Sequence, residues 1–214
     1  MAAFAGIAGQ IGLALWLVLP GLGHAADSTL CGTALVDALR SGGFNLYFRH
    51  AATEWSQSDD VRERDDWISC DSSRMRQLSE EGRQTSQRVG AAMRALEIPV
   101  GAVHASPYCR TVETATLMDI GRVETTTDVM NLRAAAFFDG RNAIVARAGD
   151  RLGMPPDSGE NAVFVAHGNV AQAATGVYPE EGEMLVFRPE GQGEFAFVGR
   201  LAPPQWHDLE GACE

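Results

Sequence analysis

The stretch NAVFVAHGN, residues 161–169, decides the fold class of this chain. Its first six residues are almost continuously apolar, which is typical of a strand buried on both faces of a parallel sheet. The apolar run ends at His167, and a glycine and an asparagine follow it. Because a parallel sheet needs helices over both of its faces, this stretch predicts an α/β fold.

The segments on either side of this stretch alternate between short apolar runs and amphipathic segments. Strands are predicted at residues 44–48, 100–105, 161–166, 184–187 and 195–198, and helices at residues 32–40, 111–119 and 143–152. A further helix is capped by Ser79 and stopped by Pro99. The sequence RPEGQGE between the last two strands indicates a hairpin. We therefore expect a single-domain, doubly wound, mostly parallel sheet flanked by helices, with a C-terminal hairpin.

The composition limits the kinds of ligand that this chain can bind. Its 214 residues carry a formal net charge of -11, and all 17 basic residues are arginine. Without lysine, Schiff-base and P-loop lysine chemistry is excluded. The negative charge argues against nucleic acid and against anionic lipid as partners, since both need a positive surface. An anion bound by this protein must therefore be held by a local cluster of cations.

Residues 1–25 have the features of a secretory signal peptide. An apolar run over residues 11–19 is followed by a Pro-Gly break, and residues 23–25 form the best small-x-small cleavage site. The run is too short for a comfortable membrane span. No Lys or Arg lies in this segment, so the usual positive n-region is missing; an upstream start would explain that, and a buried N-terminal helix is the alternative. We expect export, to a periplasm, of a mature domain at residues 27–214.

Four cysteines follow this leader, and in an oxidising compartment an even count favours disulfides. Cys31 and Cys213 lie near the two ends of the mature chain, and the termini of single domains are often close together. We therefore predict the pairs Cys31–Cys213 and Cys70–Cys109. No two cysteines have the C-x-x-C spacing of a zinc or thioredoxin-like motif. Four buried free thiols are the alternative if the leader is not a signal peptide.

Three of the predicted strands are followed by basic side chains. Arg49 and His50 follow the first strand, Arg110 follows the second, and His167 follows the third. In an open parallel sheet, ligands bind outside the carboxyl ends of the strands, so these four side chains are expected to meet at one edge. Such a cluster repels itself unless an anion occupies it, and guanidinium groups match phosphate oxygens geometrically. The helices after Arg110 and His167 add backbone donors, so the sequence predicts a phosphoryl site.

At these residues the chain resembles the histidine phosphatase (phosphoglycerate-mutase-like) superfamily. The family motif R-H-G-x-T is similar to Arg49-His50-Ala51-Ala52-Thr53, and the helix start L-S/T-x-x-G is similar to Leu78-Ser79-Glu80-Glu81-Gly82. The motif S-x-x-x-R-x-x-x-T-A is similar to the segment from Ser106 through Arg110 to Thr114-Ala115, and the second H-G pair to His167-Gly168. The resemblance covers about residues 44–187. The length and the leader are similar to those of small exported bacterial members.

The resemblance implies a phosphomonoester hydrolase that acts on a small phosphorylated metabolite or an envelope sugar phosphate. His50 would be the nucleophile and would form a phosphohistidine. Arg49, Arg110 and His167 would hold the nonbridging phosphoryl oxygens, and Thr53 would add a hydroxyl contact. The family chemistry implies no metal and no cofactor. The expected partner is a small-molecule phosphate ester, and the oligomeric state is left open.

Two departures from the family pattern affect this interpretation. Ala51 stands where the family has glycine, which places a Cβ near the phosphate. No general acid is evident, because Asp128, Glu181 and Glu183 are each expected to be solvated surface carboxylates, and Arg133 stands where an acid would be expected. These departures leave two alternatives: a phosphate- or phosphosugar-binding protein without turnover, and a phosphoglycerate mutase.

The segment at residues 54–77 is polar and irregular, and it is long enough to be a functional loop. Its Trp55 and Trp67, together with Tyr108, are candidates for lining the substrate pocket, with loop packing as the alternative. The aspartates of this segment show no ordered metal-ligand spacing. His104 and His207 are expected to be structural.

Overall fold

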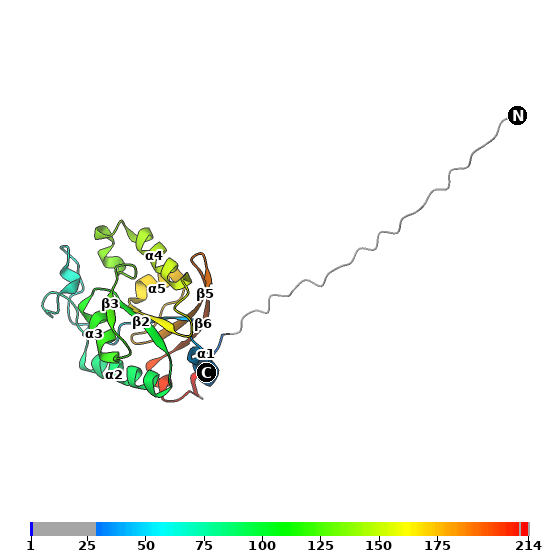
Figure 1. Cartoon of the computed structure of the whole chain (residues 1–214). Coiled ribbons are helices and arrows are strands. Elements are labelled where there is room, and N and C mark those ends of the chain that lie inside the picture. Colours follow the sequence, from blue (N-terminus) through cyan, green and yellow to red (C-terminus); the bar gives the residue numbers. More distant parts are fainter. Residues whose placement is uncertain (2–28, 210, 214) are drawn as a thin grey trace.

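The structure, a computed structural model, describes Met1, residues 29–209 and residues 211–213. Apart from Met1, the predicted signal peptide at residues 1–25 lies outside the described residues. Within the described part, helices cover both faces of one six-stranded sheet (Figure 1). The predicted α/β fold is confirmed.

The six strands lie in the spatial order β3-β2-β4-β1-β5-β6. They are β1 (Asn45–Arg49), β2 (Val100–Ala105), β3 (Val123–Thr125), β4 (Asn161–Ala166), β5 (Met184–Gly191) and β6 (Glu194–Leu201). β4 pairs in parallel with β1 and β2, and β2 pairs in parallel with β3. β5 pairs in the antiparallel sense with β1 and with β6, and the β5–β6 pair is the predicted C-terminal hairpin.

The central strand β4 is buried along its whole length. Val163 and Val165 belong to the hydrophobic cluster on one face of the sheet, whereas Phe164 belongs to the cluster on the other face. The neighbouring strand β1 alternates in the same way, with Phe48 in the first cluster and Tyr47 in the second. Since successive side chains of a strand point to opposite faces, a strand covered on both sides must be apolar at every position.

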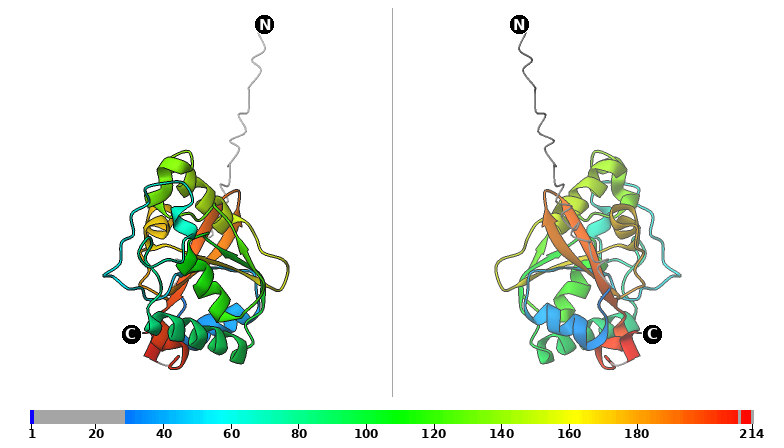
Figure 2. Two further views of the ribbon diagram at one scale, coloured as in Figure 1. Left: turned by 90° about the vertical axis from the view of Figure 1, so that its left-hand side faces the viewer. Right: turned by 90° about the vertical axis from the view of Figure 1, so that its right-hand side faces the viewer.

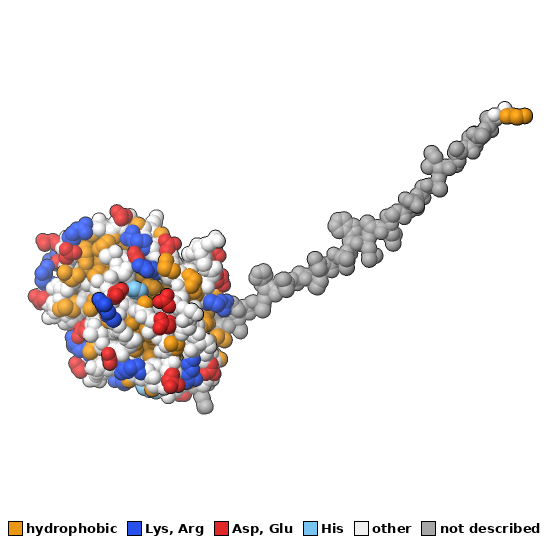
Figure 3. All heavy atoms as spheres, viewed as in Figure 1, with side chains coloured by type: hydrophobic (Ala, Val, Ile, Leu, Met, Phe, Trp, Pro, Cys, Tyr) orange, Lys and Arg blue, Asp and Glu red, His pale blue; other side chains and the backbone are white. Residues whose placement is uncertain are grey.

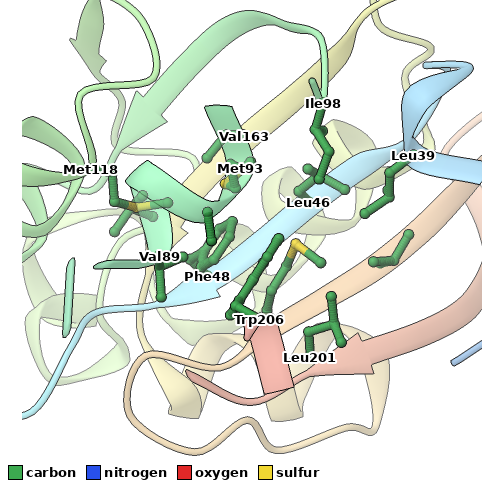
Figure 4. Close-up of a cluster of buried hydrophobic side chains, with 14 of the residues drawn as sticks. Leu39, Leu46, Phe48, Val89, Met93, Ile98, Met118, Val163, Leu201 and Trp206 are labelled. Atoms are coloured by element: carbon green, nitrogen blue, oxygen red, sulfur yellow. The ribbon is translucent and has the colours of Figure 1, made fainter. Parts of the chain in front are cut away.

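Five helices cover the two faces of the sheet. They are α1 (Gly32–Arg40), α2 (Glu80–Ala95), α3 (Cys109–Met118), α4 (Arg141–Gly153) and α5 (Gly168–Thr175). α1, α2 and α3 contribute to the first cluster, and α4 and α5 to the second; Figure 2 shows α1 and α2 on one side of the sheet and α4 on the other. In Figure 4, Val89 and Met93 of α2 lie beside Phe48 of β1. No helix in the described residues is long and apolar enough to cross a membrane.

The connections differ in how well the sequence predicts them. Ser79 caps α2 as expected, because its hydroxyl oxygen accepts a hydrogen bond from the backbone N–H of Gly82 at 3.1 Å. The long segment between β1 and α2 is irregular as expected, with one short 3₁₀ helix at Asp66–Ile68. The edge strand β3 is not predicted, because its three residues are too short for a periodic pattern. Further 3₁₀ helices occur at Leu132–Phe137, Pro203–Trp206 and Gly211–Cys213.

Both predicted disulfides, Cys31–Cys213 and Cys70–Cys109, are present. The first joins the residue before α1 to the final 3₁₀ helix, so it connects the two ends of the domain. The second joins the irregular segment 54–77 to the first residue of α3, immediately before Arg110. None of the cysteines in the described residues is free.

We expect that replacing Cys31 and Cys213 together by serine lowers the free energy of unfolding by roughly 2–5 kcal/mol. This bond spans 182 residues of chain, and its loss frees the unfolded chain to adopt many more conformations. Urea denaturation under non-reducing conditions measures the change. An unfolding free energy equal to that of the wild-type protein would show that packing alone holds the two ends together.

Candidate active site

A cavity of about 140 Å³ opens where β1, β2 and β4 end. Arg49 and His50, from the end of β1, line it together with Arg110 of α3 and His167 after β4. The sequence therefore predicted correctly that these four side chains meet at one edge of the sheet. All four are buried in the described structure, with exposed fractions between 1 % and 7 %. The surrounding face carries arginine and acidic side chains side by side (Figure 3), so the positive charge is concentrated in the cavity and does not extend over that face.

His50 is held as a neutral imidazole with one free nitrogen. Its Nδ1 lies 3.0 Å from the backbone oxygen of Ala51, and since a carbonyl can only accept, Nδ1 carries the proton. Nε2 therefore has the lone pair. Burial lowers the pKa of His50 well below the usual value of 6.5, and the positive charge of Arg110 lowers it further. At neutral pH the ring can act as a nucleophile without first losing a proton.

His167 faces His50 across the cavity. The two imidazole rings are 5.5 Å apart between centroids and nearly perpendicular. Nε2 of His167 lies 2.9 Å from the Ser106 hydroxyl oxygen, and its backbone is fixed to the Tyr47 hydroxyl group on both sides. Among the described residues Nδ1 of His167 has no hydrogen-bond partner. Burial, followed by the charge of Arg110, lowers the pKa of His167 well below its usual range.

Arg110 is bound by an acidic residue of the irregular segment. Asp59 accepts two hydrogen bonds from its guanidinium group, at 2.7 Å and 3.3 Å. Both side chains are buried, with exposed fractions of 2 % for Arg110 and 8 % for Asp59. Arg133 approaches the same carboxylate at 3.5 Å. Sequence reasoning missed this contact, because Asp59 lies in a segment whose path no periodic pattern determines.

Arg49 is bound by a second acidic residue, Glu181. Its Nη2 lies 3.3 Å from the Glu181 carboxylate, and its Nη1 donates a hydrogen bond to the backbone oxygen of Pro179. The Thr53 hydroxyl group donates to Glu181 at 2.9 Å. Thr53, predicted to contact substrate, does not line the cavity in this structure; its side chain holds Glu181 instead.

Ala51 fits its position without strain. Its φ angle is not among the positive values found in the described chain, so a Cβ is tolerated there. Its N–H donates a hydrogen bond to the Thr114 hydroxyl oxygen at 3.2 Å. The hydroxyl group of Thr114 in turn donates to the backbone oxygen of Arg110. The residue after the nucleophile and the second arginine motif are thereby joined.

The candidate carboxylates named from the sequence separate clearly. Glu181 lines the cavity. Glu183 is buried, with 3 % exposed, but it accepts from the backbone of Glu180 and pairs with Arg200 outside the cavity. The expectation that Glu181 and Glu183 are solvated surface carboxylates is therefore wrong. Asp128 is a third case, because it is bound to Arg151 at 2.7 Å, away from the cavity.

The aromatic candidates also separate. Trp55 lines the cavity, and the guanidinium of Arg76 stacks on its ring at 4.2 Å. Trp67 is buried loop packing against Phe137 and Phe138, and Tyr108 is fully buried behind Arg110.

The remaining predictions on histidine and metal concern positions outside the cavity. His104 stacks on Phe164 of β4, and neither His104 nor His207 lines the active-site cavity. Four further lining residues were not considered from the sequence as ligands: Arg76, Asn131, Asn169 and Tyr178. Within the described residues, no three His, Cys, Asp or Glu side chains are grouped to hold a metal ion.

The two buried histidines predict a dependence of stability on pH. Because their pKa values are lowered in the folded state, the unfolded chain binds more protons below pH 6.5, so stability falls as the pH falls. Between pH 7.5 and 5.5 we expect a loss of roughly 2–3 kcal/mol, measured by urea denaturation. Replacing both His50 and His167 by Gln should remove most of that slope. A slope unchanged by the double replacement would contradict the neutral, buried state of these rings.

A family model for the "histidine phosphatase superfamily (branch 1)" matches residues 46–137. This range contains Arg49, His50 and Arg110, whereas His167 lies beyond it. Among curated protein sequences, none matches the chain significantly.

Solved structures share the fold at low sequence identity. The protein histidine phosphatase SixA, complexed with tungstate, has a TM-score of 0.52 at 12 % identity, over 76 % of this chain and 98 % of that chain. The product of open reading frame Rv3214 from Mycobacterium tuberculosis has a TM-score of 0.50 at 17 % identity, over 72 % and 94 % of the two chains. TTHB049 from Thermus thermophilus also has a TM-score of 0.50 at 17 % identity, over 74 % and 99 %.

Proposed function

Because this chain belongs to the histidine phosphatase superfamily, we propose that it hydrolyses phosphomonoesters through a phosphohistidine intermediate on His50. The observation that carries the proposal is the state of His50 in the cavity. The ring is neutral, its Nδ1 proton is engaged by the Ala51 carbonyl, and the remaining nitrogen has a free lone pair. A second imidazole and two guanidinium groups line the same small space.

In the proposed first step, Nε2 of His50 attacks phosphorus in line, and the P–O bond to the leaving group breaks. Water then attacks the phosphohistidine, which releases inorganic phosphate and restores the neutral ring. Arg49, Arg110 and His167 would hold the nonbridging oxygens, where charge must be neutralised throughout the transfer. Thr53 would act through Glu181, which it holds beside Arg49.

The size of the cavity supports a small reacting group. Its volume of about 140 Å³ is below the range of about 300–1,000 Å³ that encloses a whole drug-sized ligand. A phosphoryl group and the first atoms of its ester would lie inside, and the rest of a larger substrate would lie outside. This supports a small phosphorylated metabolite or a phosphate group on an envelope sugar as the substrate.

We also propose that the protein is exported, with residues 1–25 as its signal peptide and residues 27–214 as its mature domain. The two disulfides support this, because structural disulfides form and persist mainly in oxidising compartments. N-terminal sequencing of the protein recovered from a periplasmic fraction would test the cleavage site. Recovery of the uncleaved chain from the cytosol would refute the proposal.

The enzymatic proposal is tested by trapping the intermediate. The purified chain is mixed with p-nitrophenyl phosphate and quenched in alkali, in which phosphohistidine persists, and the phosphorylated peptide is identified by mass spectrometry. We expect turnover and a phosphoryl group on His50. Saturable binding of inorganic phosphate without turnover, across a broad panel of phosphomonoesters, would instead favour a binding protein. A requirement for a bisphosphorylated primer would favour a phosphoglycerate mutase.

A further inference from the structure

We propose that Asp59 is the general acid that protonates the leaving group, and that the incoming phosphoryl group releases it for this role by taking its place on Arg110. This inference rests on the proposed phosphatase function and supplies the proton donor that the sequence does not identify. Among the described residues, two carboxyl groups line the cavity, those of Asp59 and Glu181. Their surroundings assign them different roles.

Glu181 is held by groups that substrate binding leaves in place. It accepts hydrogen bonds from the hydroxyl group of Thr53 at 2.9 Å and from its backbone N–H at 3.4 Å. Thr53 lies outside the cavity lining, so a phosphoryl group does not compete for these two donors. Glu181 also pairs with Arg49 at 3.3 Å. A carboxylate with this many donors remains ionised and orients Arg49.

Asp59 is held, within the described structure, by groups that the substrate needs. Its two oxygens occupy the two terminal nitrogens of Arg110, at 2.7 Å and 3.3 Å, which is the bidentate arrangement that a phosphoryl group also adopts. The guanidinium of Arg133 lies at 3.5 Å from the same carboxylate. Substrate and Asp59 therefore compete for one fork of donors, and a phosphoryl dianion is the stronger competitor because it carries the larger charge.

The backbone around Asp59 permits this exchange. Residues 58–61 belong to no helix or strand. The bonds that tie the segment to the rest of the fold lie to either side of these residues. The backbone N–H of Glu54 donates to the oxygen of Gln77 at 3.1 Å, and Cys70 is bonded to Cys109. Asp59 can therefore move without breaking the sheet or the disulfide.

Displacement changes the surroundings of the Asp59 carboxyl group. Besides Arg110 and Arg133, the titratable and charged groups that line the same cavity are Arg76, His50, His167, Arg49, Glu181 and Tyr178, and Tyr108 packs beneath Arg110. Once the phosphoryl dianion occupies Arg110, the carboxyl group has lost its two guanidinium hydrogen bonds and faces a negative group. A carboxylate in such a place takes up a proton more readily.

The proposed proton transfer balances over the two steps. As the bond from Nε2 of His50 to phosphorus forms, the P–O bond to the leaving group breaks, its electron pair stays on that oxygen, and the Asp59 proton moves to it. The alcohol departs and Asp59 is left ionised. Asp59 then accepts a proton from the attacking water as the P–N bond breaks, and inorganic phosphate leaves.

The test compares Asp59→Asn with Glu181→Gln on two substrates. p-Nitrophenyl phosphate has a leaving group that needs little protonation, whereas an alkyl phosphate has one that needs it fully. For Asp59→Asn we expect kcat to fall on the order of 10²-fold or more with the alkyl ester, and far less with p-nitrophenyl phosphate. The basic limb of the kcat–pH profile should disappear in the same variant. Inhibition by inorganic phosphate should be at least as strong as in the wild-type protein.

Several results would overturn this inference. Equal losses of kcat on both substrates, together with weaker phosphate inhibition, would show that Asp59 only positions Arg110. A leaving-group-dependent loss in Glu181→Gln and none in Asp59→Asn would make Glu181 the acid. If Asp59→Asn does not fold, the wild-type protein decides, since a steep dependence of its kcat on leaving-group acidity excludes any acid. Turnover with a trapped phosphohistidine in the wild-type protein separates these failures from failure of the proposed function.

Discussion

Replacing His50 by alanine is expected to reduce kcat for p-nitrophenyl phosphate by roughly 10⁴-fold or more, the scale seen when a covalent nucleophile is removed. Within the described residues no other imidazole can substitute for it. His167 is the second one in the cavity, but its Nε2 is engaged with the Ser106 hydroxyl group. Steady-state kinetics measures the loss, and phosphoryl trapping should yield no phosphohistidine in the variant.

The matched control is His104→Ala. His104 stacks on Phe164 outside the cavity, so its loss should leave kcat within a few-fold of the wild-type value. The His50→Ala protein should still bind inorganic phosphate, because Arg49, Arg110 and His167 remain. Turnover that survives in His50→Ala would reject the phosphohistidine mechanism, whatever the behaviour of the control.

The second large effect is expected for Arg110→Ala, which should lower both activity and stability. In activity it removes a bidentate clamp on the phosphoryl group, and we expect kcat/KM to fall about 10²- to 10³-fold. In stability it leaves the buried Asp59 carboxylate without its main partner, which costs roughly 3–5 kcal/mol. Aryl phosphate kinetics and urea denaturation measure the two losses separately.

A double variant separates these two effects. Arg110→Ala combined with Asp59→Ala removes both charges, so most of the unfolding free energy should return while kcat/KM stays low. Arg40→Ala is the control for stability, because its ion pair with Asp37 is exposed and should be worth less than about 1 kcal/mol. A double variant as unstable as Arg110→Ala alone would mean that Arg110 stabilises the fold through packing on Tyr108 and not through its charge.

The parts of the fold that the sequence predicts well are those in which a repeating pattern meets complete burial. The strands at residues 100–105 and 161–166 and the helix at residues 32–40 have the same bounds in the structure. In each of them, packing against a covered face fixes every second, or every third and fourth, residue. β3 shows the opposite case, since it is a partly exposed three-residue strand that only pairing with β2 defines.

The same distinction applies to the site. Arg49, His50, Arg110 and His167 were predictable because each follows a strand, and the topology of a parallel sheet brings such positions to one edge. Asp59, Arg76 and Glu181 come from segments without a periodic pattern, and their place depends on long-range contacts. For Glu181 the available signal was its position just before β5, the strand that pairs with β1.

Cys70–Cys109 has a consequence for when the protein can work. This bond fastens the segment that carries Asp59 to the helix that carries Arg110. With both thiols reduced, the sheet and its helices would persist, but that segment would sample many conformations and seldom return its carboxyl group to the cavity. The enzyme should therefore be dormant in a thiol-rich cytosol and become active only where oxidants close the bond.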